Sequence, residues 1–210
     1  MKIKLAILAA AVASVFSVSA QAAPVFSDNF DSYIADQLDW IAPIPSGWTI
    51  TNGTVDIIGS GGSYDLVPGH GSYVDLDGGS AHSGKLSHTL SLLAGHTYTL
   101  SFDLAGSHRG TSEMVNVKFG TTTENFNLAS NDGFSHHTMS FTPISSGLYS
   151  FGYQNNQFGA HLGNLEGNNI GALLDNVAVT SVPEPESYAM FMAGLGVMGF
   201  IARRRKNGQS

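Results

Sequence analysis

The chain has 210 residues, no cysteine and a formal net charge of −7 at pH 7. Without cysteine it has neither a disulfide nor a thiol nucleophile, so a disulfide-rich scaffold and a cysteine enzyme are excluded. Between two hydrophobic ends, residues 23–181 contain three basic and fourteen acidic side chains, a net charge of −11. That charge repels nucleic acid and attracts divalent cations, so we exclude nucleic acid as a partner.

The first 22 residues have the pattern of a secretory signal peptide. Lys2 and Lys4 precede an apolar run from Leu5 to Val18, and small residues follow at Ala20 and Ala22. This order predicts a signal peptide at 1–22 that signal peptidase removes after Ala22, and therefore an exported protein.

Residues 23–181 have the length of one domain and the pattern of many short strands. From His96 to Leu104, apolar and polar residues alternate, which predicts a strand with one buried face. The stretch around Asn52-Gly53 predicts a two-residue hairpin with Trp48 in the core and Ile50 opposite Val55. Further strands are predicted at 26–30, 72–76, 86–92, 115–119, 124–128, 134–141, 148–153 and 172–180. We therefore expect an all-β domain, an antiparallel β-sandwich of the jelly-roll kind.

Asp175 is the most informative residue of the domain. On the predicted last strand it shares a face with Leu173, Val177 and Val179, and a carboxylate buried there needs a partner. A hard cation such as calcium, held by oxygen atoms, is one candidate. The other carboxylates that can contribute to such a metal site are Asp28, Asp31, Asp75 and Asp77. Alternatively, Asp175 caps a bulge or faces solvent, and Asp77 begins a simple turn.

A carbohydrate site needs an aromatic platform with amide or carboxylate groups beside it. The stretch from Tyr153 to Gln157 contains Asn155 and Asn156 and is predicted as a loop, where such sites lie. Tyr64, Tyr73 and Phe158 are further aromatic candidates. The alternative is a polar surface loop whose aromatic side chains belong to the core.

No pattern of catalytic residues stands out. The serine-hydrolase elbow G-x-S-x-G is absent, and the eight histidines lack the H-x-H and H-E-x-x-H spacings. His136 and His137 are adjacent, so on a strand they point to opposite faces and cannot chelate one ion. Paired carboxylates for glycoside hydrolysis can lie far apart in sequence, and no particular pair is indicated.

The last segment, 182–210, follows the domain as a separate unit. Pro183 and Pro185 fix φ and remove backbone donors, so residues 182–186 are extended. Residues 188–202 carry no charge and predict a transmembrane helix of about 22 Å, shorter than the roughly 30 Å hydrocarbon core. Thinning of the bilayer would allow it to span. The basic cluster Arg203, Arg204, Arg205 and Lys206 then stays on the cytoplasmic side.

Motif, helix and basic cluster occur in the order that resembles the PEP-CTERM protein-sorting signal, a tail also catalogued as an ice-binding protein C-terminal domain. The resemblance implies a Gram-negative bacterium and an exosortase that recognises Val182, Pro183, Glu184 and Pro185 and cleaves the tail. It further implies a precursor held transiently in the inner membrane and a mature domain at the cell surface or in the extracellular matrix.

Residues 26–180 also resemble galactose-binding-like jelly rolls of exported PEP-CTERM proteins and of a plant cell-wall family of unknown function. The resemblance rests on runs such as G-H-T-Y-T-L-S-F-D-L-A-G and A-L-L-D-N-V-A-V. It implies that the first and last strands lie side by side and that a structural calcium joins them. Such folds include lectins, enzyme accessory modules and structural domains, so the function does not follow from the fold.

Three functions are consistent with these patterns. We expect a non-catalytic surface or matrix protein associated with exopolysaccharide or a biofilm. The first alternative is a carbohydrate-binding module with a defined glycan ligand. The second is a secreted glycan-active enzyme.

Overall fold

The structure is a computed structural model that describes residues 23–33, 36–41, 46–80, 82–157, 168–181, 192 and 194–199. The predicted signal peptide, the sorting motif Val182–Pro185 and the basic cluster Arg203–Arg205 lie outside these residues. Within the predicted helix 188–202, Met192 and residues 194–199 are described, and they are helical. No helix among the described residues is long and apolar enough to cross a membrane.

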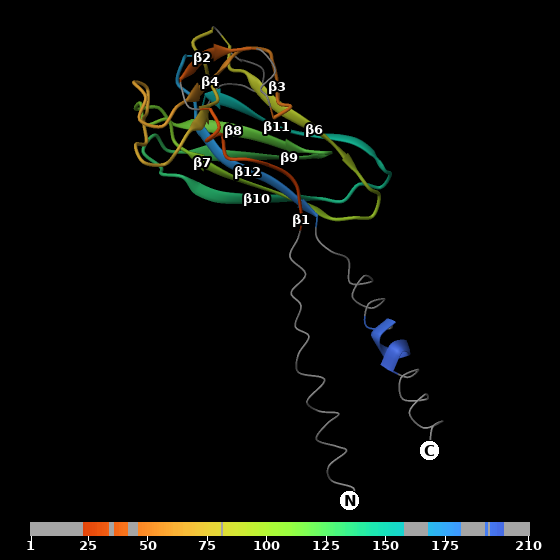
Figure 1. Ribbon diagram of the computed structural model, residues 1–210. Helices are drawn as coiled ribbons and strands as arrows, with labels where there is room; N and C mark the ends of the chain where they lie inside the picture. The colour runs from red at the N-terminus through yellow and green to blue at the C-terminus, as the bar shows by residue number, and fades with distance from the viewer. Residues whose placement is uncertain are drawn as a thin grey trace, which may run out of the picture. The chain divides into compact units, whose positions relative to one another are not determined.

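The residues Ala23–Val182 form one compact unit made of strands. Its strands are β1 (Ala23–Asp28), β2 (Gln37–Trp40), β3 (Thr49–Thr51), β4 (Val55–Ile58), β5 (Tyr73–Asp75), β6 (Lys85–Leu92), β7 (Tyr98–Ala105), β8 (Glu113–Phe119), β9 (Thr122–Leu128), β10 (Ser135–Phe141), β11 (Gly147–Gln157) and β12 (Leu173–Ser181). They form two sheets in which every neighbouring pair is antiparallel (Figure 1). The predicted all-β sandwich is confirmed.

The seven-stranded sheet has the order β10-β7-β12-β5-β4-β2, with β1 paired to β12, and the five-stranded sheet has the order β3-β6-β11-β8-β9. The first and last strands therefore lie side by side, as the domain's resemblance implied. Alternation decides which side chains enter the space between the sheets. On β7, Leu100, Phe102 and Leu104 are fully buried, and the Phe102 ring meets Tyr153 of the other sheet at 5.2 Å between centroids.

The predicted hairpin at Asn52-Gly53 is wrong. The strand before it, β3, pairs with β6, whereas the strand after it, β4, pairs with β2 and β5 in the other sheet. The chain therefore crosses between sheets here, with Asn52 at φ 69°. The reason is a later segment of the chain: Thr54 N–H donates to the His82 carbonyl and Gly84 N–H to the Thr54 carbonyl. Trp48 is nevertheless in the core, as predicted.

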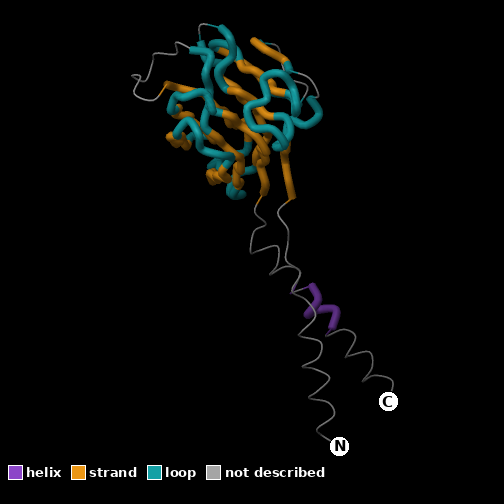
Figure 2. The backbone as a smooth tube through the Cα atoms, turned by 90° about the vertical axis from the view of Figure 1, so that its left-hand side faces the viewer, coloured by secondary structure: helices purple, strands orange, loops and turns teal. Residues whose placement is uncertain are grey.

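A second, smaller apolar cluster lies on the face of the seven-stranded sheet that points away from the sandwich core. Its buried members are Ile58, Tyr73, Ala105 and Leu173, and loop residues such as Leu66 pack against them. The Tyr73 hydroxyl accepts a hydrogen bond from Leu66 N–H at 2.6 Å, which fixes the loop 59–72 over this face. Figure 2 views the domain from the side on which loops, in teal, gather over the strands. We call the face of the seven-stranded sheet that points away from the sandwich core the outer face.

Candidate functional site

The outer face of the seven-stranded sheet carries two pairs of facing aspartates. Asp56 of β4 is the partner of Asp75 on β5, and Asp103 of β7 is the partner of Asp175 on β12. Directly opposite residues of an antiparallel ladder point to the same face. Asp56, Asp75 and Asp175 are buried, so each needs partners that offset its lost hydration.

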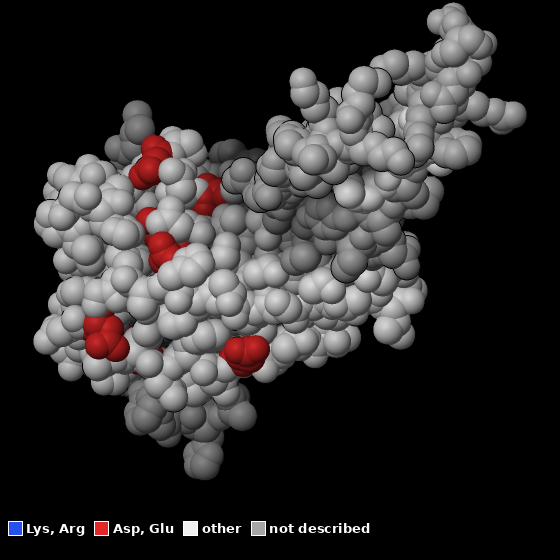
Figure 3. All heavy atoms as spheres, turned by 90° about the horizontal axis from the view of Figure 1, so that it is seen from below, with Lys and Arg blue, Asp and Glu red and all other residues white. Residues whose placement is uncertain are grey.

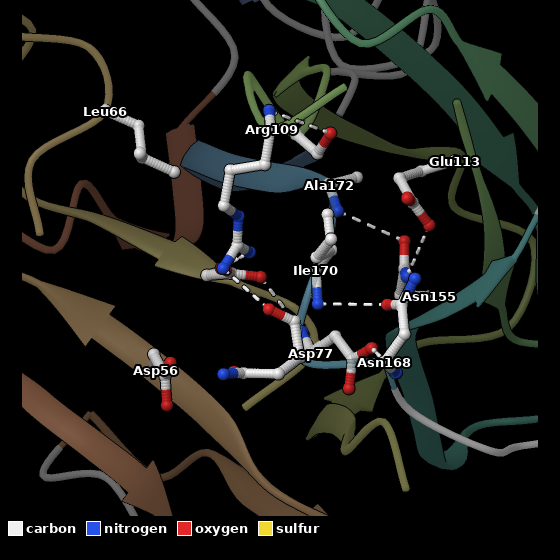
Figure 4. A network of polar contacts seen from close by, with 12 residues as sticks. Asp56, Leu66, Asp77, Arg109, Glu113, Asn155, Asn168, Ile170 and Ala172 are labelled. Carbon is white, nitrogen blue, oxygen red and sulfur yellow. Dashed lines mark hydrogen bonds and ion pairs between the residues drawn. The ribbon is translucent and has the colours of Figure 1, made fainter. Parts of the chain in front are cut away.

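Arg109, in the loop between β7 and β8, is the partner of Asp75. Its Nη2 forms an ion pair with Asp75 Oδ2, and its Nη1 donates to the carbonyl of Asn169 at 2.6 Å. Burial raises the pKa of Asp75 to about 7, and the Arg109 charge opposes that rise. Arg109 therefore ties together a strand and two loops by a single side chain (Figure 4).

The segment 168–171 closes over Asp75, the last residue of β5, and over Asp77, which follows that strand. Asn168 N–H donates to Asp77 Oδ2 at 3.1 Å, and Asp77 N–H donates to Asp75 Oδ1 at 3.1 Å. A Cβ atom at position 171 would collide with Asp75 Oδ1 and with the Asp77 nitrogen. Gly171 is thus needed for this close approach of two backbones.

The same network continues into the sandwich through Asn155. Its Nδ2 donates to Glu113 Oε2 at 3.0 Å, and its Oδ1 accepts from Ala172 N–H at 3.2 Å (Figure 4). Because Asn155 belongs to the five-stranded sheet and Ala172 precedes β12, this side chain cross-links the two layers. Burial raises the pKa of Glu113, which Thr111 and Asn155 oppose by donating hydrogen bonds.

The sugar platform predicted at Tyr153, Asn155, Asn156 and Gln157 is corrected by this geometry. These residues extend strand β11 rather than forming a loop. The alternation of the strand points Tyr153 and Asn155 into the interior, where they are 0% and 2% exposed. Asn156 is also buried, and the Gln157 side chain is outside the described part of the chain. No ligand reaches an aromatic ring that the core already covers.

The open aromatic residue of the outer face is Tyr64, which was among the further candidates. It lies in the loop 59–72, is 54% exposed, and borders a pocket of about 170 Å³. The other residues that line this pocket are Asp56, Ile58, Ser63, Asp65, Leu66, Asp75 and Arg109. Gly61 N–H donates to Asp65 Oδ2 at 2.8 Å, so the loop around Tyr64 is braced from within. We call this the Tyr64 pocket.

The chemistry of the Tyr64 pocket combines an exposed ring, carboxylates and a guanidinium group. Asp56 accepts a hydrogen bond from Asp39 N–H at 2.7 Å, and burial raises its pKa. Arg109 supplies donors and the carboxylates supply acceptors, which is what a ligand with many hydroxyl groups requires. The pocket is smaller than the roughly 300–1,000 Å³ of sites for drug-sized ligands, and it suits one small polar unit at a time.

The second group of predicted metal ligands lies around Asp175. Asp175 is 3% exposed, but the face predicted for it is wrong. A bulge between Asp175 and Ala178 turns Val177 and Val179 into the sandwich core, whereas Leu173 belongs to the outer cluster. Nε2 of His70 lies 3.0 Å from Asp175 Oδ2. Asp28 accepts hydrogen bonds from Trp48 Nε1 at 3.0 Å and from Phe30 N–H at 2.9 Å. Asp31 accepts from Ser72 N–H at 2.9 Å. The partner of Asp175 that sequence reasoning missed is thus a histidine 105 positions away in the printed sequence.

The five predicted calcium ligands do not come together as one set. Asp75 and Asp77 belong to the Arg109 network, whereas Asp28 and Asp31 are electrostatic neighbours of Asp175. Within the part of the chain that the structure describes, no three His, Asp or Glu side chains are grouped so that they could hold a metal ion. Because the five carboxylates lie in two separate groups, they do not form one calcium site. Calcium binding itself stays a prediction, which the melting temperature with and without a chelator would test.

The buried carboxylates make stability depend on pH. Burial raises the pKa of Asp75 and of Asp175 to about 7, whereas an unfolded aspartate has a pKa of about 3.9. Between these values the folded state binds more protons, so the contribution of both groups to the free energy of unfolding falls as the pH rises from about 4 to about 7.

We expect the urea midpoint to fall over that pH range and the variant Asp175→Asn, which cannot ionise, to flatten the fall. The exposed substitution Glu124→Gln removes a carboxylate without burial and serves as the control. Equal slopes for Asp175→Asn and the wild type would contradict the prediction.

Comparisons with known proteins give a family for the domain and a motif for the tail. Residues 181–206 match the PEP-CTERM protein-sorting motif, which confirms the predicted sorting tail. No curated protein matches the chain. One solved structure, described as "CBM4 structure and function", is 18% identical over 73% of this chain and 97% of its own, with a TM-score of 0.45. The CBM22-1 xylan-binding domain from Paenibacillus barcinonensis Xyn10C is 10% identical over 78% of this chain and 97% of its own, with a TM-score of 0.49.

The family assignment rests on residues 37–180, which match a family model described as "Protein of unknown function (DUF642)". This match includes β2 to β11 and all but the last residue of β12, and thus every residue of the Tyr64 pocket. Because it extends over more than half of the chain, the protein belongs to the DUF642 family.

Proposed function

We propose that this protein is exported, sorted to the cell surface by an exosortase, and binds a glycan of the extracellular matrix without catalysis. The sorting part is supported by the PEP-CTERM motif at 181–206, which contains Val182, Pro183, Glu184 and Pro185. Cleavage by an exosortase after membrane insertion would leave the domain at the surface. At the cell surface, the domain would be in contact with the exopolysaccharide of the extracellular or biofilm matrix, which is therefore the proposed source of the glycan.

The observation that carries the binding part is the Tyr64 pocket. Its exposed ring lies at the rim, and Asp56, Asp65 and Arg109 line the same hollow. An aromatic ring provides an apolar surface for the face of a sugar, and the polar groups can exchange hydrogen bonds with its hydroxyls. The apolar cluster under Leu66 holds the loop in place, so the pocket is formed before the ligand arrives.

The charge of the domain narrows the class of glycan. Acidic side chains are spread over the surface in Figure 3, and neither Lys nor Arg is seen on that face. In the pocket, Arg109 is already paired with Asp75, and Asp56 and Asp65 add two further carboxylates to the lining. A polymer of uronic acids would be repelled by these carboxylates. We therefore propose a neutral or amine-bearing glycan.

We propose binding without catalysis because two carboxylates of the pocket already hold other groups of the protein. Asp75 is engaged by Arg109 and by Asp77 N–H, and Asp56 is engaged by Asp39 N–H. Asp75 therefore holds the loop that carries Arg109, and Asp56 holds strand β2. A glycosidase instead needs one carboxyl group free to donate a proton and a second free to act as base or nucleophile.

A glycan array probed with mature protein recovered from producing cells tests the proposal. We expect saturable binding to neutral or amine-bearing glycans and no release of reducing sugar, and we expect the recovered mass to lack residues 1–22 and 188–206. No binding to any glycan would refute the binding part. Sugar release that Asp56→Asn abolishes would establish a glycan-active enzyme instead, and an intact tail would refute cleavage.

A further inference from the structure

Three large aliphatic side chains are exposed at or beside two loops of the domain. Leu93, which follows β6, is 55% exposed, Ile144 between β10 and β11 is 98% exposed, and Leu148 in β11 is 77% exposed. Single exposed aliphatic residues are common on protein surfaces. Three on neighbouring loops are a feature that needs an explanation. We call these three residues the aliphatic tip.

Backbone contacts bring the two loops together. Gly95 N–H donates to the Pro143 carbonyl at 2.9 Å, and Ala94 N–H donates to Ser146 Oγ at 2.9 Å. Leu148 is the partner of Ser91 in the ladder between β11 and β6. The tip is therefore one surface with a defined backbone, formed where two loops connect the five-stranded sheet to the seven-stranded sheet.

The tip lies at the end of the domain from which the chain continues into the sorting tail. Phe141, the last residue of β10, pairs with Tyr98, the first residue of β7, and Tyr98 pairs with Ser181 at the end of β12. Ser181 in turn pairs with Ala23 at the start of β1. The two loops that carry the tip thus project from the strand ends that also hold both boundaries of the domain.

This end differs from the rest of the domain in charge. The segments 91–97 and 142–148 contain no Asp, Glu, Lys or Arg, although residues 23–181 carry a net charge of −11. An acidic surface is repelled by anionic lipid, whereas an uncharged one with aliphatic side chains can enter the interfacial layer of a bilayer. The tip therefore has a composition suited to contact with the interfacial layer of a membrane.

Membrane insertion of the sorting tail, as proposed above, would keep this end of the domain near the lipid surface. Between Ser181 and the apolar run 188–202 stand six residues, 182–187, which span at most about 22 Å when fully extended. While the run 188–202 is inserted, the tip is within reach of the lipid surface, at a high effective concentration. Weak contacts are then sufficient for orientation, even though they would not hold a free domain.

We propose that the aliphatic tip rests in the lipid interface of the membrane that holds the uncleaved tail. In this position the aliphatic tip keeps the domain in one orientation, in which the Tyr64 pocket does not face the lipid, until the tail is cut. Cleavage removes the tether, and the domain leaves the lipid because the tip alone binds too weakly. This inference rests on the sorting part of the proposed function and is independent of glycan binding.

The test uses the uncleaved chain with its tail, reconstituted in phosphatidylcholine vesicles whose acyl chains are brominated. Because the chain has no cysteine, Ile144→Cys places a single environment-sensitive fluorophore at the tip. The control Asn131→Cys labels an exposed turn before β10, at the other end of the strand that finishes at Phe141. We expect a blue shift and quenching by bromine at 144 and neither at 131.

Two further readouts make the outcome decisive. Adding Leu93→Ser and Leu148→Ser to the labelled Ile144→Cys chain is expected to abolish the quenching while leaving the protein in the vesicles. Equal signals at 144 and 131, or quenching that survives both serine substitutions, would overturn the tip proposal alone. Failure of the chain to remain with the vesicles would overturn it together with the sorting proposal.

Discussion

Replacing Arg109 with methionine is expected to lower the free energy of unfolding by about 3 kcal/mol at neutral pH. Removing one partner of a buried ion pair costs roughly 3–5 kcal/mol, because the remaining charge is buried without compensation. The lower value applies here since Asp75, whose pKa burial has already raised to about 7, can take up a proton instead. The carbonyl of Asn169 also loses its donor. Urea unfolding at pH 7 measures the loss.

The same variant carries its own pH test and control. At pH 5 Asp75 is mostly protonated in both proteins, so the difference between wild type and Arg109→Met should shrink. Lys118→Met removes an equal charge from an exposed position and should cost less than about 0.5 kcal/mol. The double variant Arg109→Met, Asp75→Asn should recover part of the loss. A loss that is independent of pH and unaffected by Asp75→Asn would contradict this role for the ion pair.

Truncation of Trp48 to alanine is expected to lower the free energy of unfolding by about 4 kcal/mol. Trp48 is fully buried, and its ring meets Phe26 at 5.4 Å and Phe151 at 5.3 Å between centroids. Such truncations cost roughly 3–5 kcal/mol through lost contacts and the cavity that remains. In addition, Asp28 loses the donor that Trp48 Nε1 provides at 3.0 Å.

The conservative variant Trp48→Phe separates these two contributions. It keeps an aromatic ring in the core and removes the indole N–H, so we expect a cost of about 1–2 kcal/mol. Both variants are compared by urea unfolding at one pH. A Trp48→Phe protein as unstable as Trp48→Ala would show that the bond to Asp28, rather than packing, dominates.

The sandwich could be predicted because alternation is local. On β7 the residues Tyr98, Leu100, Phe102 and Leu104 identify both the strand and its buried face without knowledge of any neighbour. Pairing is not local, and the Asn52-Gly53 turn shows this. A hairpin signal there was overridden by hydrogen bonds to His82 and Gly84, which no local pattern includes.

The site was predicted in its parts and not in its arrangement. The strand pattern identified Asp175 as a buried carboxylate in need of a partner, whereas the run Y-V-D-L-D-G identified Asp75 and Asp77 only as possible metal ligands. With three basic residues in the domain, Arg109 was one of few candidates for such a partner. His70 gave no signal, because its contact with Asp175 depends on how the loop 59–72 lies over the outer face. Tyr153 was assigned to a loop because the sequence after it is polar, whereas strand β11 continues through these polar residues to Gln157.

Titration of the wild type and of Tyr64→Ala with the glycan that the array identifies tests the central claim most directly. Tyr64 is 54% exposed, so its truncation should leave the fold intact. The loss of the aromatic contact should weaken binding at least about tenfold. Ile144→Ala, which shortens an even more exposed apolar side chain at the aliphatic tip, should bind like the wild type. Equal affinities for the wild type and Tyr64→Ala would contradict the account, because the glycan would then bind outside the Tyr64 pocket.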